Sequence, residues 1–258
     1  MSSILFEIKN SIAFITLNRP EKFNAFNRQM SLDLQEKLDE CEKNISIRCV
    51  YITGAGKGFS SGQDLTEAID PNGAEMEKII SEQYNPIIRK IRNLSKPVIA
   101  AVNGIAAGAG ANVALCCDVI VAAESASFIQ AFSKIGLIPD CGGTYFLPRL
   151  IGLQKSSALM MLGDKISAKE AERMGMIYQY FPDELFFYEA EKIAVTLSQL
   201  PTKGLAYTKQ ALNKSLEQTL EQQLETEDLL QQKAAATNDF KEGVSAFIEK
   251  RKANFKGD

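Results

Sequence analysis

Asp140 stands out among the ionisable residues because of its surroundings in the sequence. It lies between Pro139 and the glycine pair Gly142-Gly143 in KIGLIPDCGGTYFLPRLIG, a stretch that is otherwise almost uncharged. Burial in an apolar pocket would raise the pKa of an Asp above its usual value of about 3.9, which makes the carboxyl better able to take and return a proton. Asp140 could equally be the N-cap of a helix in GGTYFLPRL. From the local sequence, a catalytic base and a helix cap are both open interpretations.

Two glycine-rich turns, each after an apolar strand, could bind an oxyanion. FSSGQD follows VYIT, and NGIAAGAGAN follows PVIAAV. Small residues leave backbone N–H groups accessible, and two N–H groups aimed at one point stabilise an enolate-like intermediate by several kcal/mol. Taken alone, such turns are more often tight packing turns. The sequence by itself does not join the two turns into one site.

The absence of histidine excludes several kinds of chemistry. Residues 58–62, GFSSG, match the nucleophile elbow of serine hydrolases, but a Ser-His-Asp triad cannot be built without histidine. The commonest metal ligand is missing for the same reason. GAGKG does not have the spacing of a phosphate-binding loop. We therefore expect chemistry based on carboxylates and backbone amides, with no metal.

Composition and charge indicate an ordinary globular protein. The 258 residues are 45% hydrophobic and 24% charged, with a formal net charge of −3, so no strongly basic nucleic-acid face is expected. No apolar segment approaches the roughly 20 residues of a membrane span, and the N-terminus does not have the pattern of a leader peptide. We expect a cytoplasmic protein that binds neither nucleic acid nor membrane. Its five cysteines form no CxxC pair and should be reduced core thiols: Cys41, Cys49, Cys116, Cys117 and Cys141.

Hydrophobic periodicity predicts the elements that position these residues. A hairpin is expected around Asn10-Ser11, and strands rich in Val, Ile and Ala suggest a sheet covered on both faces. We expect an α/β core over residues 1–195 and a helical C-terminal region over 196–258, with helices almost throughout after Pro148. The further predicted segments are helices over residues 30–42, 75–94 and 106–117, and strands over 48–54, 97–104 and 119–124.

A basic cluster lies near the C-terminus. EKRKANFK contains Lys250, Arg251, Lys252 and Lys256. A solvated helix end is the ordinary explanation, and a phosphate-binding rim is the functional one.

Four motifs in order carry a resemblance to a known family. FSSGQDL, KPVIAAVNGIAAGAG, IGLIPDCGGTYFLPRLIG and EGVSAFIEKRKANF resemble the crotonase, or enoyl-CoA hydratase/isomerase, superfamily, from the first hairpin to the last helix. The resemblance implies a spiral of ββα units with a helical C-terminal trimerisation region, forming trimers or dimers of trimers.

The resemblance also implies a CoA-thioester site. The backbone N–H groups of Gln63 and Ala109 would form one oxyanion hole, and coenzyme A would belong to the substrate, with no other cofactor. The segment 63–67 would line the CoA arm, and Phe247 and Lys250, of the same or a neighbouring subunit, would meet the adenosine 3′-phosphate end. The implied substrate-binding residues are Ser61, Gly62, Asp64, Leu65, Gly108, Asn112, Phe132, Phe247 and Lys250.

Two departures from the family pattern point away from hydration. Hydratases of the family activate water with two glutamates, and Asn112 and Phe132 occupy those positions here. Asp140 stands where the isomerase branches, including that of phenylacetate degradation, carry an acid. The resemblance therefore implies an isomerase that moves a double bond, or rearranges a ring epoxide (1,2-epoxyphenylacetyl-CoA to oxepin-CoA), through an enolate-like intermediate with Asp140 as proton shuttle. The alternatives are a hydratase of fatty-acid-type substrates, a non-catalytic binding protein of the same fold and a hydrolase.

Overall fold

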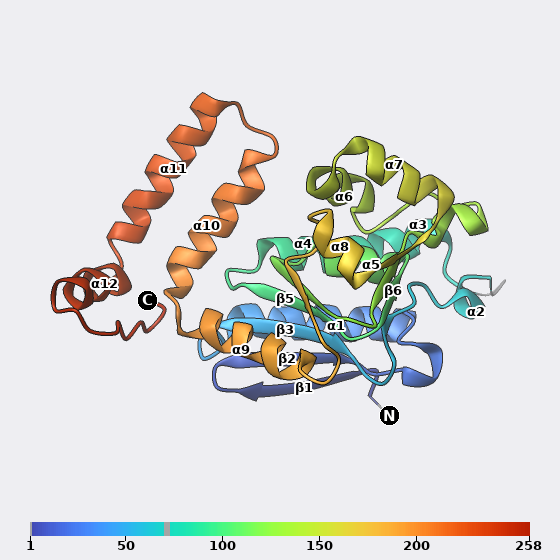
Figure 1. The fold of residues 1–258 in the computed structure, drawn as a ribbon, viewed down its shortest axis with the longest axis horizontal. Helices are drawn as coiled ribbons and strands as arrows, with labels where there is room; N and C mark the ends of the chain where they lie inside the picture. The colour runs from blue at the N-terminus through green and yellow to red at the C-terminus, as the bar shows by residue number, and fades with distance from the viewer. Residues whose placement is uncertain (1, 70–72) are drawn as a thin grey trace.

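Two sheets form the framework of the fold (Figure 1). The computed structural model describes residues 2–69 and 73–258. The larger sheet has the order β1-β2-β3-β5-β7-β10, and the smaller has the order β4-β6-β8-β9. The strands are β1 Ile4–Lys9, β2 Ile12–Leu17, β3 Cys49–Gly54, β4 Gly58–Ser60, β5 Val98–Val102, β6 Ile105–Ala107, β7 Val119–Ala123, β8 Ser127–Ile129, β9 Lys165–Ser167 and β10 Gln179–Phe181.

The chain alternates between the sheets, which creates a spiral. β3, β5 and β7 are neighbours in the larger sheet, while β4, β6 and β8, each following one of them, are neighbours in the smaller sheet. All these pairings are parallel, with Ile52 opposite Ala100 in one sheet and Ile105 opposite Ser127 in the other. The spiral of ββα units implied by the family resemblance is present.

The predicted hairpin is confirmed. β1 and β2 pair antiparallel with Lys9 opposite Ile12. The two turn residues have positive φ, 53° at Asn10 and 61° at Ser11. A two-residue turn with positive φ at both positions matches the twist of the strands that it joins.

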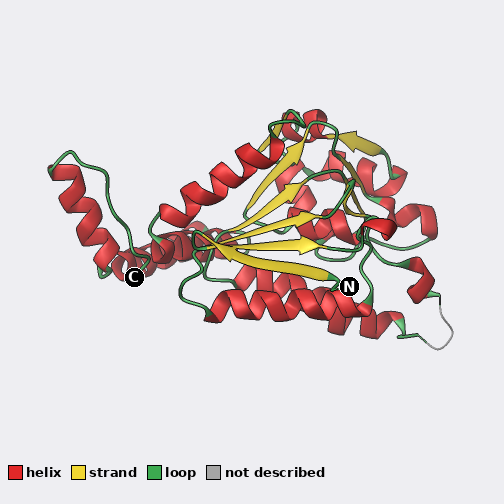
Figure 2. Cartoon of the chain, turned by 90° about the horizontal axis from the view of Figure 1, so that it is seen from below, coloured by secondary structure: helices red, strands yellow, loops and turns green. Residues whose placement is uncertain are grey.

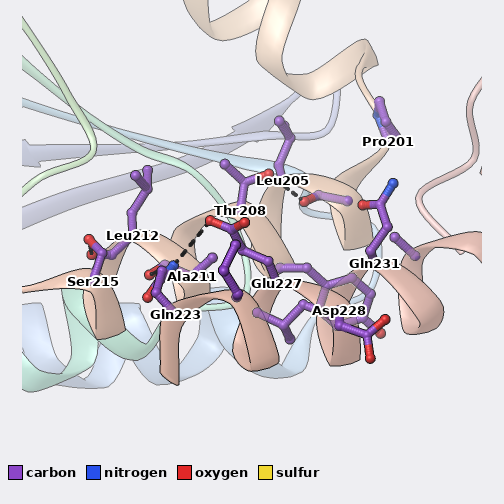
Figure 3. A pocket seen from close by; sticks show the side chains of 15 residues that line it. Pro201, Leu205, Thr208, Ala211, Leu212, Ser215, Gln223, Glu227, Asp228 and Gln231 are labelled. Carbon is purple, nitrogen blue, oxygen red and sulfur yellow. Dashed lines mark hydrogen bonds between the residues drawn. The ribbon is translucent and has the colours of Figure 1, made fainter. Parts of the chain in front are cut away.

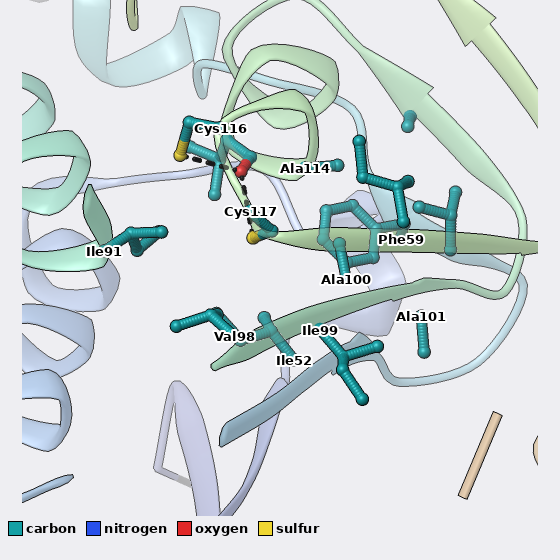
Figure 4. Packing of buried hydrophobic residues seen from close by; sticks show 14 of the residues in the cluster. Ile52, Phe59, Ile91, Val98, Ile99, Ala100, Ala101, Ala114, Cys116 and Cys117 are labelled. Carbon is teal, nitrogen blue, oxygen red and sulfur yellow. Dashed lines mark hydrogen bonds between the residues drawn. The ribbon is translucent and has the colours of Figure 1, made fainter. Parts of the chain in front are cut away.

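The central strands are buried on both faces, as predicted. Every residue of β3 and β5 is buried. Figure 4 shows Phe59 of β4 in the same core as Ala100 of β5 and Ala114 of helix α5. The core cysteines are free thiols, and the thiols of Cys116 and Cys117 both donate to the carbonyl of Val113.

The helices are α1 Arg28–Lys43, α2 Leu65–Ala68, α3 Met76–Lys78, α4 Asn85–Asn93, α5 Ala109–Leu115, α6 Gly143–Ile151, α7 Leu153–Leu162, α8 Ala168–Arg173, α9 Phe186–Gln199, α10 Thr202–Ser215, α11 Leu220–Ala235 and α12 Asn238–Ile248. Helix α1 packs against β1, β2 and α4, and α9 packs against β2, β3, β5 and β7. Together with α5, these helices bury the sheets and position the site.

The helix predicted over residues 75–94 is interrupted. Between α3 and α4 the chain forms a wider π-helical turn, Ile79–Tyr84, just before Pro86. Proline has no N–H to donate to the preceding turn. The Gln35 side-chain amide of α1 instead donates to the carbonyls of Glu82 (2.9 Å) and Gln83 (3.1 Å).

Two other element predictions need correction. The helix predicted over residues 106–117 begins only at Ala109, since Ala106 and Ala107 belong to β6. The region after Pro148 contains two short strands, β9 and β10, because each pairs with a strand from an earlier part of the chain. Pro148 itself lies inside α6.

The last three helices extend away from the sheets (Figures 1 and 2). A groove of about 920 Å³ runs between α10 and α11, and Figure 3 shows Leu212 and Gln223 among the side chains that line it. The proposed boundary at residue 195 stays a prediction, and α9 runs across it. None of the helices in the described part of the chain has the length and apolar character needed to cross a bilayer.

Candidate active site

The two glycine-rich turns lie in direct contact. A Cβ atom on Gly62 would lie 2.8 Å from the carbonyl oxygen of Ala107 and 3.3 Å from the nitrogen of Ala109. Gly62 also has a φ of 94°, which L side chains rarely adopt. Only glycine permits this approach, so the turn after β4 meets the start of α5.

Two backbone N–H groups are available at this contact. Phe26 donates to the carbonyl of Gly62 (2.7 Å) and accepts from the N–H of Asp64 (2.9 Å), so the N–H of Gln63 between them points away from Phe26. Ala109 is the first residue of α5, where N–H groups have no partner within the helix. Among residues 2–69 and 73–258, neither the Gln63 nor the Ala109 N–H has an acceptor.

The serine of the GFSSG match is a structural residue. Ser60 is fully buried, and its hydroxyl donates to the carbonyl of Asn24 (2.8 Å). It also accepts from the N–H of Gly62 (3.3 Å). A hydroxyl bonded in this way is not an exposed nucleophile, in agreement with the lack of histidine.

Asp140 is not the cap of α6. The N-cap residue is Gly142, and no side chain caps this helix. Cys141 and Gly142 have φ values of 50° and 71°, which turn the chain sharply after Asp140. The Oδ1 atom of Asp140 is buried and has no hydrogen-bond partner in the described part of the chain. A carboxyl oxygen buried without a partner calls for a functional explanation.

Burial raises the pKa of Asp140 to about 6. Interactions with the Cys141 thiol and with the residue's own N–H lower the pKa, but by less than burial raises it. The same burial, together with the neighbouring carboxyl, raises the pKa of Cys141 well above its usual value. A carboxyl with this pKa is suited to exchange a proton near neutral pH, and the neighbouring Cys141 thiol stays protonated.

Asn112 connects the Asp140 loop to α5. Its side-chain amide is completely buried and donates to the backbone carbonyl of Asp140 (2.9 Å). It accepts from the side-chain amide of Gln130 (2.8 Å). A Cβ on Gly143 would lie 2.3 Å from the Asn112 amide nitrogen, so the loop packs closely here. Asn112 thus connects the Asp140 loop to Gln130, and its role in binding substrate stays a prediction.

Gln130 is a site residue that sequence reasoning missed. It is buried at the end of β8, directly before a 3₁₀-helical turn, Ala131–Ile135. The only signal was an amide side chain after the apolar stretch SFI. Because its partner lies 18 positions away in the sequence, that signal did not identify a role.

Phe132 and Gly108 lie together on the apolar side of the turn. The ring of Phe132 is buried and lies 3.8 Å from the position that a Cβ on Gly108 would occupy. Gly108 precedes α5 with a φ of 51°, and its N–H donates to the carbonyl of Ile129 (2.9 Å). Phe132 thus provides a hydrocarbon surface beside Ala109.

The segment after Gln63 begins α2. Asp64 caps this helix by accepting from the N–H of Thr66 (3.2 Å), and it pairs with Arg19 (2.8 Å). Burial opposes ionisation of Asp64, but Arg19 and Thr66 outweigh it, so the pKa of Asp64 is lowered. Ser61 and Leu65 are exposed beside it. Asp64 therefore holds the turn in place as an ionised carboxylate.

Phe247 and Lys250 lie apart from these residues within one chain. Phe247 belongs to α12, which Figures 1 and 2 show at the far end of the C-terminal helices from α5 and α6. Lys250 lies two residues beyond the end of α12. Phe247 is 86% exposed. One chain alone does not bring this pair to the Asp140 site.

A metal site is not evident in the part of the chain that the structure describes. No group of three or more Cys, Asp or Glu residues there could hold a metal ion. The expectation that the protein needs no metal or separate cofactor stays a prediction.

The sequence matches a known protein family over almost its whole length. The family profile described as "Enoyl-CoA hydratase/isomerase" matches residues 7–258. The chain belongs to the enoyl-CoA hydratase/isomerase family. As a member of this family it is an enzyme, and its spiral is the crotonase fold.

Two curated relatives illustrate the range of the family. A 1,2-epoxyphenylacetyl-CoA isomerase of Escherichia coli is 45% identical, covering 100% of this chain and 99% of the relative. A probable enoyl-CoA hydratase of Rhodobacter capsulatus is 42% identical, covering 99% of this chain and 98% of the relative.

Solved structures of the family share the fold. A putative enoyl-CoA hydratase of Streptomyces coelicolor has a TM-score of 0.93 at 34% identity, covering 99% of this chain and 94% of that one. A putative enoyl-CoA hydratase/isomerase of Mycobacterium abscessus has a TM-score of 0.92 at 33% identity, covering 98% of both chains.

Proposed function

We propose that this enzyme is an acyl-CoA isomerase with Asp140 as its only acid–base residue. The observation that carries the proposal is the half-buried Asp140 carboxyl, whose Oδ1 atom is buried without a partner among the described residues and whose pKa is raised to about 6. The two positions at which family hydratases carry glutamates hold Asn112, which is bonded within the protein, and Phe132, a hydrocarbon ring. One carboxyl suffices for an isomerisation, because the proton that it removes can be returned at another carbon.

The reaction would proceed through an enolate-like intermediate. The Gln63 and Ala109 N–H groups would bind the thioester oxygen and stabilise the charge that develops on it. Asp140 would take a proton from the α-carbon, the electrons would shift towards the thioester, and Asp140 would return the proton at the far end of the double bond. No atom is gained or lost. The apolar surface of Phe132 would keep water from the intermediate.

The substrate class is an enoyl-CoA or the ring epoxide of phenylacetyl-CoA. The second choice is supported by the relative whose name is 1,2-epoxyphenylacetyl-CoA isomerase. In that case the product would be the oxepin-CoA, and the enzyme would act in phenylacetate catabolism in the cytoplasm.

Hydration of fatty-acid-type enoyl-CoA is the second candidate. Relatives named probable enoyl-CoA hydratase and 2,3-dehydroadipyl-CoA hydratase, at 42% and 34% identity, favour it. It would require Asp140 alone to activate water.

We also propose a homotrimer or a dimer of trimers. Apolar side chains are exposed along the C-terminal helices, including Leu212, Leu224 and Phe247. Assembly would cover the groove of Figure 3 and would bring Phe247 and Lys250 of one subunit to the CoA site of a neighbour. Arg251 already pairs with Glu242 and Glu249, whereas Lys250 forms no ion pair with a described residue.

The test is incubation of the enzyme with a 3-enoyl-CoA while product mass and the absorbance of the conjugated thioester are followed. An isomerase gives unchanged mass and rising absorbance. A hydratase gives a product heavier by one water, and a hydrolase releases free CoA thiol. Absence of any change would contradict isomerisation of this substrate class.

A further inference from the structure

Tyr84 is a buried tyrosine whose hydroxyl has no hydrogen-bond partner in the described part of the chain. The residue is 1% exposed and ends the π-helical turn before Pro86. Buried tyrosine hydroxyls are usually hydrogen-bonded, and π-helical turns occur frequently at functional sites. The π-helical turn and the unpaired hydroxyl thus coincide at Tyr84, which makes it a candidate functional residue.

The ring of Tyr84 lies against Phe26, which forms an isolated parallel bridge with Gln63. Its centroid is 6.3 Å from that of Phe26, edge to face at 77°. The backbone of Phe26 is bonded to Gly62 and Asp64, on either side of Gln63. Tyr84 thus packs behind one half of the oxyanion turn.

The same helical face meets the Asp140 loop. Ile88 follows Tyr84 by four residues, a spacing that places both on one face of the helix. Its Cγ2 atom lies 3.9 Å from the position of a Cβ on Gly142, two residues after Asp140. The face of Tyr84 and Ile88 therefore borders both halves of the candidate site.

The ionisable groups that shift the pKa of Tyr84 agree with its place beside the candidate site. Burial raises the pKa of Tyr84 most, followed by Cys141, Asp140, Glu67 and Asp64. These four groups come from the Asp140 loop and from the segment after Gln63. The hydroxyl between them stays protonated and can act only as a neutral donor or acceptor.

We propose that Tyr84 is a specificity-determining residue that donates a hydrogen bond to an oxygen atom on the acyl group, close to the carbon that Asp140 serves. The proposal rests on the proposed isomerase function and makes acyl-CoA thioesters with an epoxide, ether or other oxygen acceptor near the reacting carbons its preferred substrates, with a hydrocarbon 3-enoyl-CoA bound more weakly but still isomerised. A hydrocarbon acyl group would leave the buried hydroxyl unpaired, and sites with a buried donor discriminate strongly against ligands without the matching acceptor.

The test compares two ligands that differ only in this oxygen. Phenoxyacetyl-CoA has an ether oxygen where 3-phenylpropanoyl-CoA has a methylene group. Dissociation constants for both are measured by calorimetry for the wild type, Tyr84→Phe and Tyr51→Phe. Tyr51 is the matched control because it is also buried but lies in β3, where it stacks on Phe14. Thermal unfolding checks that each variant is folded.

The wild type should bind the ether ligand about tenfold or more tightly than the methylene ligand. Tyr84→Phe should lose this preference, and Tyr51→Phe should keep it. Equal affinities in the wild type, or a preference that survives in Tyr84→Phe, would overturn the inference, and the wild-type comparison does not depend on the folding of any variant. Isomerisation of a 3-enoyl-CoA is assayed on the same preparation. Failure of isomerisation with the binding preference intact would overturn the proposed function and leave the oxygen contact supported.

Discussion

Asp140 is held in a state that favours proton transfer at the expense of stability. Its carboxyl is buried, and one oxygen has no partner among the described residues. Cys141 adopts a positive φ, which is unfavourable for a residue with a side chain. A buried carboxyl oxygen at Asp140 and backbone strain at the adjacent Cys141 are typical of a functional site.

The pH dependence of activity should report the ionisation of Asp140. The base must be ionised to accept a proton, and its pKa is raised to about 6. We expect kcat/KM for isomerisation to rise with pH and to level off above an apparent pKa near 6. A profile that is flat between pH 5 and pH 8 would contradict the role of Asp140 as the base.

Replacing Asp140 with Asn should stabilise the protein above pH 6. The pKa of Asp140 is higher in the folded protein than in the unfolded chain. At pH values between these two pKa values the folded protein therefore binds more protons than the unfolded chain. The free energy of unfolding falls as pH rises through this range. A rise from 3.8 to about 6 corresponds to about 3 kcal/mol in favour of Asp140→Asn at pH 8, and to little difference at pH 3. Chemical unfolding at both pH values measures this, and lower stability of the variant at pH 8 would refute it.

At the scale of elements, α5 links the oxyanion turn to the base. Ala109 is its first residue, and Asn112, one turn later, is bonded to the Asp140 carbonyl and to Gln130. Asn112 and Gln130, which follows β8, thus fix the separation between Ala109 and Asp140, the proposed oxyanion-binding N–H and the proposed proton shuttle. A small change in this separation has a large effect on rate.

Replacing Gln130 with Leu should impair turnover more than binding. The side-chain oxygen of Asn112 would lose the hydrogen bond that Gln130 donates to it. Asn112 would then hold the Asp140 loop less rigidly. We expect kcat to fall about tenfold or more with KM within about threefold. Gln29→Leu, on the exposed side of α1, is the control and should match the wild type. A rise in KM alone would show that Gln130 contacts the substrate instead.

Local patterns predicted the elements that have strong periodicity. The hairpin, α1 and the buried strands β3, β5 and β7 follow from their own side chains. The short strands β4, β6 and β8 could not be predicted, because three residues are ordered only by pairing with distant parts of the chain. The π-helical turn depends on Pro86 together with Gln35 of another helix. Asp140 was identified from its neighbours, whereas Gln130 and Tyr84 are defined by three-dimensional contacts.

At the scale of the whole molecule, a buried ion network joins α10 to the core. Lys209 donates to Asp118 (2.7 Å) and to the carbonyl of Ile91 (2.7 Å), and Arg92 also pairs with Asp118 (3.1 Å). Without Lys209, Asp118 would keep Arg92 as a cationic partner, but the contacts that Lys209 makes with Asp118 and with the Ile91 carbonyl would be lost.

Replacing Lys209 with Met should loosen the C-terminal helices. We expect a loss of about 1–3 kcal/mol in the free energy of unfolding and faster hydrogen exchange in α10 than in β3 and β5. Lys203→Met, at the start of the same helix, should change neither quantity. Unchanged exchange in α10 of Lys209→Met would show that the network does not hold this helix.

Assembly should depend on the groove between α10 and α11. Leu212→Asp would place a charge in a surface that the proposed oligomer buries, so we expect the sedimentation coefficient to fall to that of a smaller species, with a higher KM for acyl-CoA. Leu5→Asp on β1 is the control of similar exposure. A wild type that sediments as a monomer would contradict the proposed trimer.

The most direct test of the account is the isomerisation rate of Asp140→Asn beside that of the wild type, with acyl-CoA binding measured on both. The amide has nearly the same shape as the carboxyl but cannot take a proton. The account predicts that the variant loses turnover of a 3-enoyl-CoA by a factor of about a thousand or more while it binds the thioester as tightly as the wild type. Turnover comparable to the wild type would contradict the central claim that Asp140 is the proton shuttle.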